Sequence, residues 1–436
     1  MDEGAARPTR FRWVLVVWIA VIGAISYLDR VNISIAGHTI AQQYHLSNPE
    51  LGLVFSAFSI GYMLFQIPAG RFTDRFGPRK TLTLGAIWWA VFTSLTASVP
   101  GGIGAALFAF WSVRFLLGAG ESVMYPSSNR WLADWIPTAE RGVANGIIFA
   151  GVGTGAALAP PIIATIMLRY GWRASFHVCA LLGIAGGLIW LWLARNRPEQ
   201  HPWVNRAEID FIARGIENRN RSDAPPLPWS ALFGSKDVWA LTFSYFCYGY
   251  TAYIFFTWFF IYLTTVRGLN LKTGSYYTML PFIAMAVCSA LGGVLSDAVT
   301  RRAGRRWGRC GVGVLGLAGA AVFVALGSLA HSAAAASVIL AGGAGALYIS
   351  QSSYWSVSAD LGGNSSGTLS GTMNMGAQLG SAITAAVTPL IADRVGWTAS
   401  FLVAAGLCAL GALAWLLVNP NQSLTPQAQQ AVRSCE

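Results

Sequence analysis

The sequence predicts an all-α polytopic membrane protein with twelve transmembrane helices arranged in two six-helix bundles. Hydrophobic residues make up 54% of the 436 positions and charged residues only 11%, whereas soluble domains carry about 25% charged residues. The apolar residues gather in runs long enough to cross a bilayer, which takes about 20 helical residues. These two observations exclude a disordered chain, a disulfide-stapled secreted module and an ordinary cytosolic enzyme.

Twelve apolar runs are predicted to be spans, and their connections are short except for one. In chain order the predicted spans cover residues 13–36, 51–71, 81–99, 104–131, 142–168, 174–194, 238–264, 273–296, 310–330, 335–357, 367–391 and 397–418. The exception is the polar segment 195–237, which divides the chain into six spans and six. We therefore expect an N-terminal bundle over 1–194, a cytoplasmic central loop over 195–237, a C-terminal bundle over 238–418 and a cytoplasmic tail over 419–436.

The distribution of Lys and Arg predicts the orientation of the spans. With the N-terminus in the cytoplasm, 22 of the 29 basic residues fall in inner segments, five in outer segments and two within spans. Because basic loops stay on the cytoplasmic side, we expect a multi-pass protein of the cell inner membrane with both termini in the cytoplasm. The same distribution accounts for the net charge of +11 without a nucleic-acid partner, since no soluble domain gathers the basic residues.

A short motif recurs after the second and the eighth span. The first copy, GRFTDRFGPRK, begins at Gly70 and holds Asp74 and Arg75. The second copy, GVLSDAVTRRAGRR, begins 223 residues later at Gly293 and holds Asp297. An offset of about half the chain indicates duplication of a six-span unit. The alternative is a pair of charged inner loops that only follow the rule for basic residues.

Four ionisable side chains are predicted to lie inside spans, where a charge is costly and indicates function. They are Asp29 and Arg30 in the first span and Arg114 and Glu121 in the fourth. An arginine binds a carboxylate through two hydrogen bonds and keeps its proton, whereas a poorly hydrated carboxylate can titrate near neutral pH. Protonation of Asp29 or Glu121 would free an arginine for an anionic substrate, so that proton and anion cross together. The alternative is two internal ion pairs that only hold the two helices together.

These residues and their surroundings resemble a known family. The segments YLDRVNIS (27–34), GYMLFQIPAGRFTDRFG (61–77), RFLLGAGESVMYPSSNRW (114–131), ADWIPTAERGVANGI (133–147), GAALAPPI (155–162) and GTMNMGAQLG (371–380) are similar to the anion:cation symporter family of the major facilitator superfamily. The resemblance covers about residues 12–418. It implies a central cavity between two bundles, rocker-type alternating access, and proton-coupled uptake of acids such as hexuronates, galactonate and glucarate.

The resemblance also implies a role for individual residues. Asp29 and Glu121 match the two carboxylates of proton coupling. Arg30 matches the arginine that meets the substrate carboxylate, and Arg114 matches an arginine that pairs with the acidic residues and shapes the site. The further substrate contacts expected on this basis are Tyr27, Tyr62, Ser352, Tyr354, Trp355, Asn374 and Gln378.

The resemblance also implies a role for the repeated loop motif, and this sequence differs from family members at two positions. In the superfamily the Asp and Arg of the motif help to lock one conformation, so Asp74, Arg75 and Asp297 are expected to act in gating. A small residue at about Gly151 stands where members close to the galactonate carriers have Gln, and Ala377-Gln378 stands where Gly-Asn is frequent. Both differences are expected on the sugar side of the site and leave proton coupling unaffected.

The function expected from these patterns is secondary active import of an organic anion, a sugar acid (hexuronate, aldonate or aldarate) together with protons. Within transport, the alternative is an uncoupled facilitator or a proton-driven exporter of another organic anion or metabolite. A receptor on a transporter fold and an intramembrane enzyme are the alternatives outside transport. Tyr250 and Tyr253 in the seventh span are weaker candidates for contact with a polyol, with packed tyrosines as the alternative.

No cofactor and no metal site is predicted. The sequence has no P-loop, no nucleophile elbow and no cluster with metal-ligand spacing, so ion gradients are the only energy source that it indicates. The expected partners are a small organic anion, protons and the lipid bilayer, and we expect the protein to be a monomer.

Overall fold

The computed structural model describes residues 7–100, 106–137, 140–215, 233–362 and 366–421, without the side chains of residues 74, 141, 142, 359, 362 and 366–368. Every regular element within these ranges is a helix. Nine helical stretches are long and apolar enough to cross a membrane, or ten when a pair bent by 48° counts as one span. The stretch Leu271–Leu329 holds two helices separated at Gly304. With these counted separately and the 20-residue α3 included, the described helices occupy all twelve predicted spans.

The N-terminal half contains seven helices because the predicted fourth span is broken in two. These helices are α1 (Phe11–Tyr44), α2 (Asn48–Phe76), α3 (Pro78–Ala97), α4 (Ala106–Glu121), α5 (Met124–Trp135), α6 (Arg141–Tyr170) and α7 (Trp172–Leu193). The start of α2 is fixed by a capping box, in which Ser47 and Glu50 each accept a hydrogen bond from the other's backbone N–H. α1 continues to Tyr44, well beyond the predicted end at residue 36.

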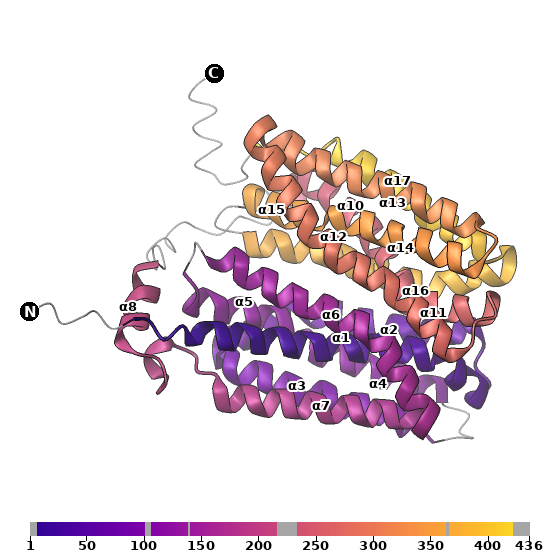
Figure 1. Ribbon diagram of the computed structural model, residues 1–436, viewed down its shortest axis with the longest axis horizontal. Coiled ribbons are helices and arrows are strands. Elements are labelled where there is room, and N and C mark those ends of the chain that lie inside the picture. The colour runs from indigo at the N-terminus through magenta and orange to yellow at the C-terminus, as the bar shows by residue number, and fades with distance from the viewer. Residues whose placement is uncertain (1–6, 101–105, 138–139, 216–232, 363–365, 422–436) are drawn as a thin grey trace, which may run out of the picture.

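The C-terminal half has two interrupted spans of its own. Its seventh span consists of α10 (Lys236–Thr257), α11 (Phe259–Ile261) and η4 (Tyr262–Val266), and its tenth of α14 (Ala333–Ile349) and α15 (Gln351–Gly362). The other helices are α12 (Leu271–Arg305), η5 (Arg306–Gly311), α13 (Val312–Leu329), α16 (Ser366–Val395) and α17 (Trp397–Trp415). Figure 1 shows α1–α7 gathered on one side of the molecule and α10–α17 on the other.

The two halves pack together through a hydrophobic core that they share. One hydrophobic core contains residues of both halves, such as Phe55 and Trp258, whose ring centroids lie 5.2 Å apart. The other two cores each belong to a single half. Across the shared core Ser34 Oγ donates a hydrogen bond of 2.7 Å to the carbonyl of Thr257. In Figure 1 the halves meet at the end that holds α11, which we call the closed end, and diverge toward the opposite end, which we call the open end.

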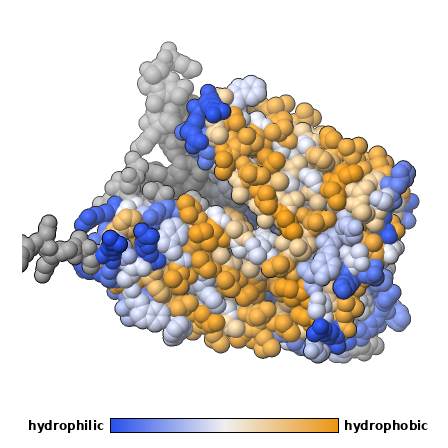
Figure 2. All heavy atoms as spheres, in the orientation of Figure 1, coloured by the Kyte–Doolittle hydropathy of each residue, from blue (hydrophilic) through white to orange (hydrophobic). Residues whose placement is uncertain are grey.

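Apolar side chains cover the flanks of both halves. Figure 2 shows hydrophobic residues along the length of the helices and hydrophilic residues gathered at the two ends. Leu84 and Leu181 of the N-terminal half and Leu291 and Leu413 of the C-terminal half are all exposed. Soluble monomers rarely expose an apolar surface of this size. In a protein with twelve membrane spans, lipid chains cover this surface.

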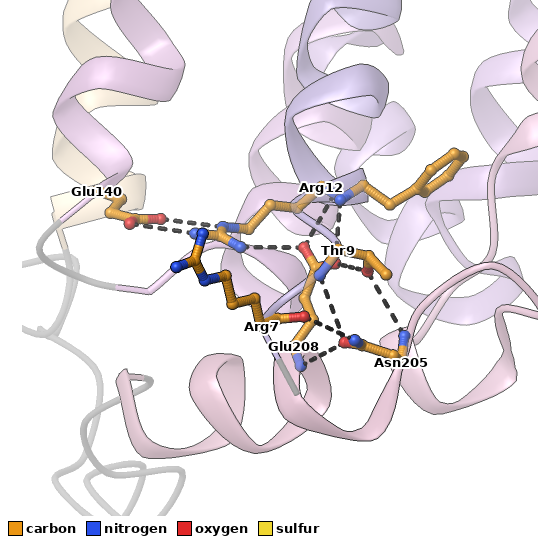
Figure 3. A network of polar contacts seen from close by, with 7 residues as sticks. Arg7, Thr9, Arg12, Glu140, Asn205 and Glu208 are labelled. Carbon is orange, nitrogen blue, oxygen red and sulfur yellow. Dashed lines mark hydrogen bonds and ion pairs between the residues drawn. The ribbon is translucent and has the colours of Figure 1, made fainter. Parts of the chain in front are cut away.

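A buried arginine fastens the segment between the halves to the N-terminal half. This segment contains η2 (Pro198–Gln200) and α8 (Arg206–Gly215). Arg12 of α1 forms ion pairs of 3.0 Å with Glu208 of α8 and with Glu140 just before α6 (Figure 3). Glu208 also accepts hydrogen bonds from Thr9 Oγ1 and from the backbone N–H groups of Phe11 and Arg12. We call Arg12, Glu140 and Glu208 the Arg12 clamp, which makes the open end of the N-terminal half one packed unit.

Removal of Arg12 is predicted to destabilise the protein strongly. Arg12 is 4% exposed and Glu208 is 0% exposed, and loss of one partner of a buried ion pair costs about 3–5 kcal/mol. Arg12→Ala should therefore lower the thermal unfolding temperature in detergent far more than Arg206→Ala, which removes an exposed pair with Asp210 on the same α8. Equal unfolding temperatures for the two variants would contradict this account of the clamp.

Acid is predicted to weaken the clamp through Glu208. Burial alone would raise the pKa of the Glu208 carboxyl, but the hydrogen bonds from Thr9, from two backbone N–H groups and from Arg12 outweigh it and hold this pKa below its ordinary value. Such a group stabilises the fold above its unfolded pKa of about 4.3 and loses this contribution as the pH falls through its folded pKa. The unfolding temperature of the unmodified protein should therefore fall more between about pH 6 and about pH 3.5 than that of Glu208→Gln. Parallel curves would rule the interpretation out.

Candidate functional site

Arg30, in the middle of α1, links the two halves. Its Nε atom donates to Glu121 Oε1 of α4 at 2.6 Å, its Nη2 atom lies 2.5 Å from the same oxygen in an ion pair, and its Nη1 atom donates to Tyr253 of α10 at 3.1 Å. Glu121 belongs to the N-terminal half and Tyr253 to the C-terminal half. The guanidinium is therefore held by a carboxylate on one side and by a neutral hydroxyl on the other.

Aromatic rings surround the two buried guanidinium groups. Arg30 lies 4.6 to 5.0 Å from the ring centroids of Tyr27, Phe58 and Tyr62. Arg114 lies 5.2 Å from the centroid of Phe58. The negative face of an aromatic ring attracts a cation, and more so where water is absent. The rings thus stabilise positive charge without supplying an acceptor that would compete with an anionic ligand.

A small cavity opens between the halves beside both arginines. From the N-terminal half it is lined by Arg30, Ile33, Phe55, Phe58, Ser59 and Arg114, and from the C-terminal half by Tyr253, Phe256 and Thr257. At its rim Ser59 of α2 and Ser381 of α16 form a hydrogen bond of 2.5 Å between their hydroxyls. The cavity therefore lies where the halves meet, below the contacts of the closed end.

Arg114 has more unused donors than Arg30, whose Nη2 lacks a hydrogen bond but lies in the ion pair with Glu121. Its side chain is 2% exposed, and Nε and Nη1 have no hydrogen-bond partner within the described residues. A buried guanidinium with free donors is costly, and Arg114 lines the cavity. The arrangement can bind an oxyanion at this point.

Glu121 is the last residue of α4, where the fourth span is broken. The chain passes through Ser122 and Val123 before α5 begins at Met124. The helix that carries Glu121 packs tightly against α2, because a Cβ atom at Gly61 or Gly118 would lie only 2.1 Å from a carbonyl of the facing helix. Oε1 accepts hydrogen bonds from Ser26 Oγ and Arg30 Nε and forms the ion pair with Arg30, whereas the buried Oε2 has no hydrogen-bond partner within the described residues.

Asp29 lies on another side of α1 and does not line the cavity. It is 1% exposed, and neither carboxylate oxygen has a hydrogen-bond partner among the described residues. Its electrostatic neighbours are Glu121 and Arg114 of α4 and the thiol of Cys179 of α7. The structure thus brings the four predicted charges into one group inside the N-terminal half, with only the two arginines lining the cavity.

The C-terminal half contributes neutral polar groups, several of them next to the break between α14 and α15. Gln351 Nε2 donates to Tyr245 at 3.4 Å, and Gln378 of α16 lies beside Tyr253. The atoms in this group that are buried and have no hydrogen-bond partner within the described ranges are Gln351 Oε1, Ser352 Oγ, Trp355 Nε1 and Gln378 Oε1. A ligand with hydroxyl groups could use both the donors and the acceptors of this set.

The other predicted contacts fall into two groups. Tyr27 and Tyr62 lie against Arg30, and the Tyr62 hydroxyl is buried without a described partner. Asn374 is half-buried on α16, one turn before Gln378. Tyr354, in contrast, packs inside the C-terminal half, where its ring lies 4.8 Å from that of Trp415 and its hydroxyl bonds Ser244. The structure does not bring Tyr354 together with the arginines.

Four neighbours of the site were not among the predicted residues, namely Ser26, Phe58, Ser59 and Gln351. Ser26 lies one turn before Arg30 on α1 and shares its partner Glu121, so the spacing of four residues is a signal that could have identified it. Phe58 precedes Tyr62 by the same spacing on α2. Tyr253, a weaker candidate from the sequence, contacts Arg30 directly.

The predicted gating residues lie at the open end. The Asp297 carboxylate of α12 accepts a hydrogen bond of 2.8 Å from Arg309 of η5. Arg75 is exposed at the end of α2 and lies over the ring of Phe76, and the Asp74 side chain lies outside the described part of the structure. In the same loop, Arg79 donates twice to the carbonyl of Leu191 and ties the first motif to α7.

Gly151, which was expected on the sugar side of the site, has a role in helix packing instead. A Cβ atom at Gly151 of α6 would lie 2.5 Å from the carbonyl of Ala20 on α1. No side chain fits there, so Gly151 permits the contact between α6 and α1 and is not on the sugar side of a site. Among the described residues, no group of three or more His, Cys, Asp or Glu side chains could hold a metal ion.

Comparison with known proteins gives consistent matches along the chain. The family model of the Major Facilitator Superfamily matches residues 19–384 and 306–434. A probable sulfoacetate transporter of Cupriavidus necator is 34% identical over 398 residues, which is 91% of each chain. A hexuronate transporter of Bacillus subtilis is 29% identical over 92% of this chain and 93% of its own. A probable galactarate/D-glucarate transporter of Escherichia coli is 32% identical over 68% of each chain.

A solved structure shares the fold. A bacterial homologue of the human lysosomal transporter Spinster, in an inward-facing and occupied conformation, superposes with a TM-score of 0.75 at 17% identity. The superposition covers 94% of this chain and 97% of the homologue.

Gly52 of α2 offers a test of the closed end. A Cβ atom there would lie 2.5 Å from the carbonyl of Ala385 and 3.0 Å from Pro389 Cγ, both on α16. Gly52→Ala is therefore predicted to force the closed end apart and to populate a conformation that is open on that side. Spin labels on cysteines introduced at Asn48 and Asp393, whose side chains lie 3.4 Å apart, should report longer distances by electron resonance in a background without the native cysteines.

The matched control for Gly52 is Gly406→Ala on α17, where a Cβ atom would meet nothing within 4 Å. This variant should keep the short distances of the parent protein. The same distance distribution in both glycine variants would show that the contact of α2 with α16 does not hold the closed end.

Proposed function

The chain belongs to the Major Facilitator Superfamily, and on this premise we propose that it is a proton-coupled symporter that imports an organic anion by alternating access. Its sequence relatives are transporters of small organic anions, and the chain is accordingly a transporter of organic anions and not an enzyme. The coupling ion, the direction of transport and the kind of anion are what we propose beyond this.

The observation that carries the proposal is the state of Arg114. Its guanidinium is buried beside the cavity, with Nε and Nη1 free of hydrogen-bond partners within the described residues. An arginine keeps its charge in any such setting and matches a carboxylate or a sulfonate through parallel hydrogen bonds. A substrate oxyanion bound there would satisfy donors that the protein itself leaves unused.

Neutral polar groups opposite the arginines favour a sugar acid. Gln351, Trp355 and Gln378 offer donors and acceptors without charge, which suits the hydroxyls of a hexuronate or an aldonate. A small acid with a carboxylate and a sulfonate, such as sulfoacetate, would place a second charge against this neutral surface or share both arginines. We therefore propose a polyhydroxy carboxylate as substrate and treat short sulfonates as the comparison that tests it.

Proton coupling is proposed to act through Glu121. Its Oε2 atom is buried and has no described partner, so a proton can be added there without breaking an existing hydrogen bond. The protonated carboxyl is neutral and holds Arg30 less strongly than the carboxylate does. Nε and Nη2 of Arg30 then become available to the anion, next to Arg114 at the same cavity.

Asp29 is proposed to be the second proton site. The two arginines and the two carboxylates balance one another in the empty state, and each substrate charge that enters requires one proton to restore the balance. Asp29 is buried without a described hydrogen-bond partner near Arg114 and Glu121, where an uncompensated charge is costly. Protonation of both Asp29 and Glu121 would allow more than one proton to accompany the anion.

The orientation in the membrane follows from the basic residues at the open end. Figure 1 shows α8 at that end; Arg206 begins α8, Arg7 and Arg10 precede α1, and Arg195 follows α7. Basic segments remain cytoplasmic. We propose that the open end faces the cytoplasm of a cell whose inner membrane holds the protein as a monomer, with both termini inside. The structure then corresponds to the state from which substrate leaves for the cytoplasm.

Ligand binding should depend on Arg114. Purified protein, screened by thermal shift against sugar acids, short sulfonates and dicarboxylates, should be stabilised by polyhydroxy carboxylates, and Arg114→Gln should weaken that binding by about tenfold or more, since a lost charged hydrogen bond is worth about 1.5–3 kcal/mol. Arg206→Gln, an exposed change on α8, is the control and should bind normally. Full binding by Arg114→Gln would remove the basis of the proposed site.

Accumulation of substrate should depend on Glu121 and Asp29. In proteoliposomes with an inward proton gradient, Glu121→Gln combined with Asp29→Asn should exchange substrate across the membrane but should not concentrate it, because this double variant has no carboxylate left to carry a proton. Asp210→Asn, on the exposed surface of α8, should concentrate substrate like the unmodified protein. Uptake against a gradient by the double variant would contradict the coupling role of the two carboxylates, and gradient-independent uptake by the unmodified protein would identify a facilitator.

A further inference from the structure

A dense group of basic residues lies where α12 ends and the chain continues into η5. Its members, which we call the basic turn, are Arg301, Arg302, Arg305 and Arg306. All four are exposed, and none of them lines the cavity between the halves. α12 begins beside α11 at the closed end and runs toward the open end (Figure 1). The basic turn therefore lies at the open end of the C-terminal half.

No acidic side chain neutralises the basic turn within the described residues. Between Asp237 and Asp360 the chain has a single acidic residue, Asp297. Its carboxylate lies 2.8 Å from Arg309 in an ion pair, so its charge is already balanced. No ion pair among the described residues involves a member of the basic turn. The turn thus presents four positive charges that the described part of the protein leaves uncompensated.

Contacts behind the basic turn fix its backbone. Gly304 has a φ of 81°, which allows a sharp change of direction after α12. Ser296 Oγ of α12 donates to the carbonyl of Gly308 at 2.8 Å, and a Cβ atom at Gly308 would collide with Thr300. Because η5 packs so closely on the end of α12, the arginines extend from an ordered backbone, and a ligand does not have to order a loop when it binds.

Exposed apolar side chains lie next to the basic turn. Trp307 directly follows it and is 68% exposed. Arg306 Nη2 donates to the carbonyl of Leu416, whose side chain is exposed at the end of α17. Val294 is exposed on α12 and precedes Arg301 by seven residues, which places it on the same face two turns away. Since tryptophan is typical of the membrane–water interface, this surface fits a molecule with an anionic head and an apolar tail.

We propose that the basic turn binds the phosphate of an anionic phospholipid, whose acyl chains lie along the apolar flank of the C-terminal half (Figure 2). Arginine matches phosphate oxygens through paired N–H donors. Clusters of four or more basic residues just beyond a membrane span are typical of anionic-lipid recognition. The inference concerns a lipid and not the transported anion, so it stands or falls independently of the proposed function.

The first copy of the repeated motif provides a matched control for positive charge in general. Its basic residues are spread over ten positions, and Arg79 donates to a carbonyl of α7. Arg71 and Lys80 are exposed at the end of α2 and the start of α3. Substitution of these two removes as much charge from the open end as substitution of Arg302 and Arg305 does.

Lipid binding to the full-length protein in detergent can be measured by native mass spectrometry, with phosphatidylglycerol, phosphatidylcholine and glycerol 3-phosphate titrated separately. The unmodified protein should bind phosphatidylglycerol most tightly, because phosphatidylcholine has no net charge and glycerol 3-phosphate has no acyl chains. Arg302→Gln with Arg305→Gln should weaken phosphatidylglycerol binding by about tenfold or more, since each basic residue near an anionic lipid surface contributes about fivefold. Arg71→Gln with Lys80→Gln should bind phosphatidylglycerol like the unmodified protein.

Three results would overturn the inference. The first is unchanged phosphatidylglycerol binding by the variant of Arg302 and Arg305, whose unfolding temperature in detergent should equal that of the unmodified protein because both side chains are exposed. The second is an equal loss in the two double variants, which would assign the effect to basic charge in general. The third is equal affinity for glycerol 3-phosphate, which would identify a soluble phosphate as the ligand.

Discussion

Two guanidinium groups that keep their charge, those of Arg30 and Arg114, lie within the apolar N-terminal half. The surrounding structure has to stabilise these buried charges. Arg30 receives a carboxylate, a tyrosine hydroxyl and three aromatic faces. Arg114 receives only the ring of Phe58 and more distant acidic residues. Because a buried charge without partners is unfavourable, the difference between the two arginines is the feature on which the proposed anion binding depends.

The breaks in the spans lie close to the polar groups that the site needs. The fourth span is interrupted just after Glu121, and the corresponding tenth span is interrupted just before Gln351 and Ser352. Interrupted helices at equivalent positions of two repeats are typical of transporter binding sites, because irregular backbone is tolerated inside a membrane only beside a cavity or within protein. The seventh span, which carries Tyr253, bends by 48° at Trp258, close to the end where the halves join.

The sequence was sufficient to predict the twelve spans and the four buried charges, since both depend on local composition and on the high cost of charge in a bilayer. It could not show which carboxylate would pair with which arginine, because that depends on how α1 and α4, which are far apart in the sequence, bring Arg30 and Glu121 together. Side-chain direction was also not predictable for neutral residues. Tyr354 and Trp355 are adjacent in the chain, yet Tyr354 packs against Trp415 while the Trp355 indole N–H is left without a described partner.

The Arg12 clamp has a practical consequence for handling the protein. Glu208 and Glu140 come from segments separated from Arg12 by more than a hundred residues, and both rely on a cation that stands close to the start of the chain. Deletion of the first dozen residues, or fusion of a bulky partner directly before α1, would leave Glu140 and Glu208 without their counterion. An affinity handle for purification is therefore better attached through a long spacer or placed elsewhere than directly before Thr9.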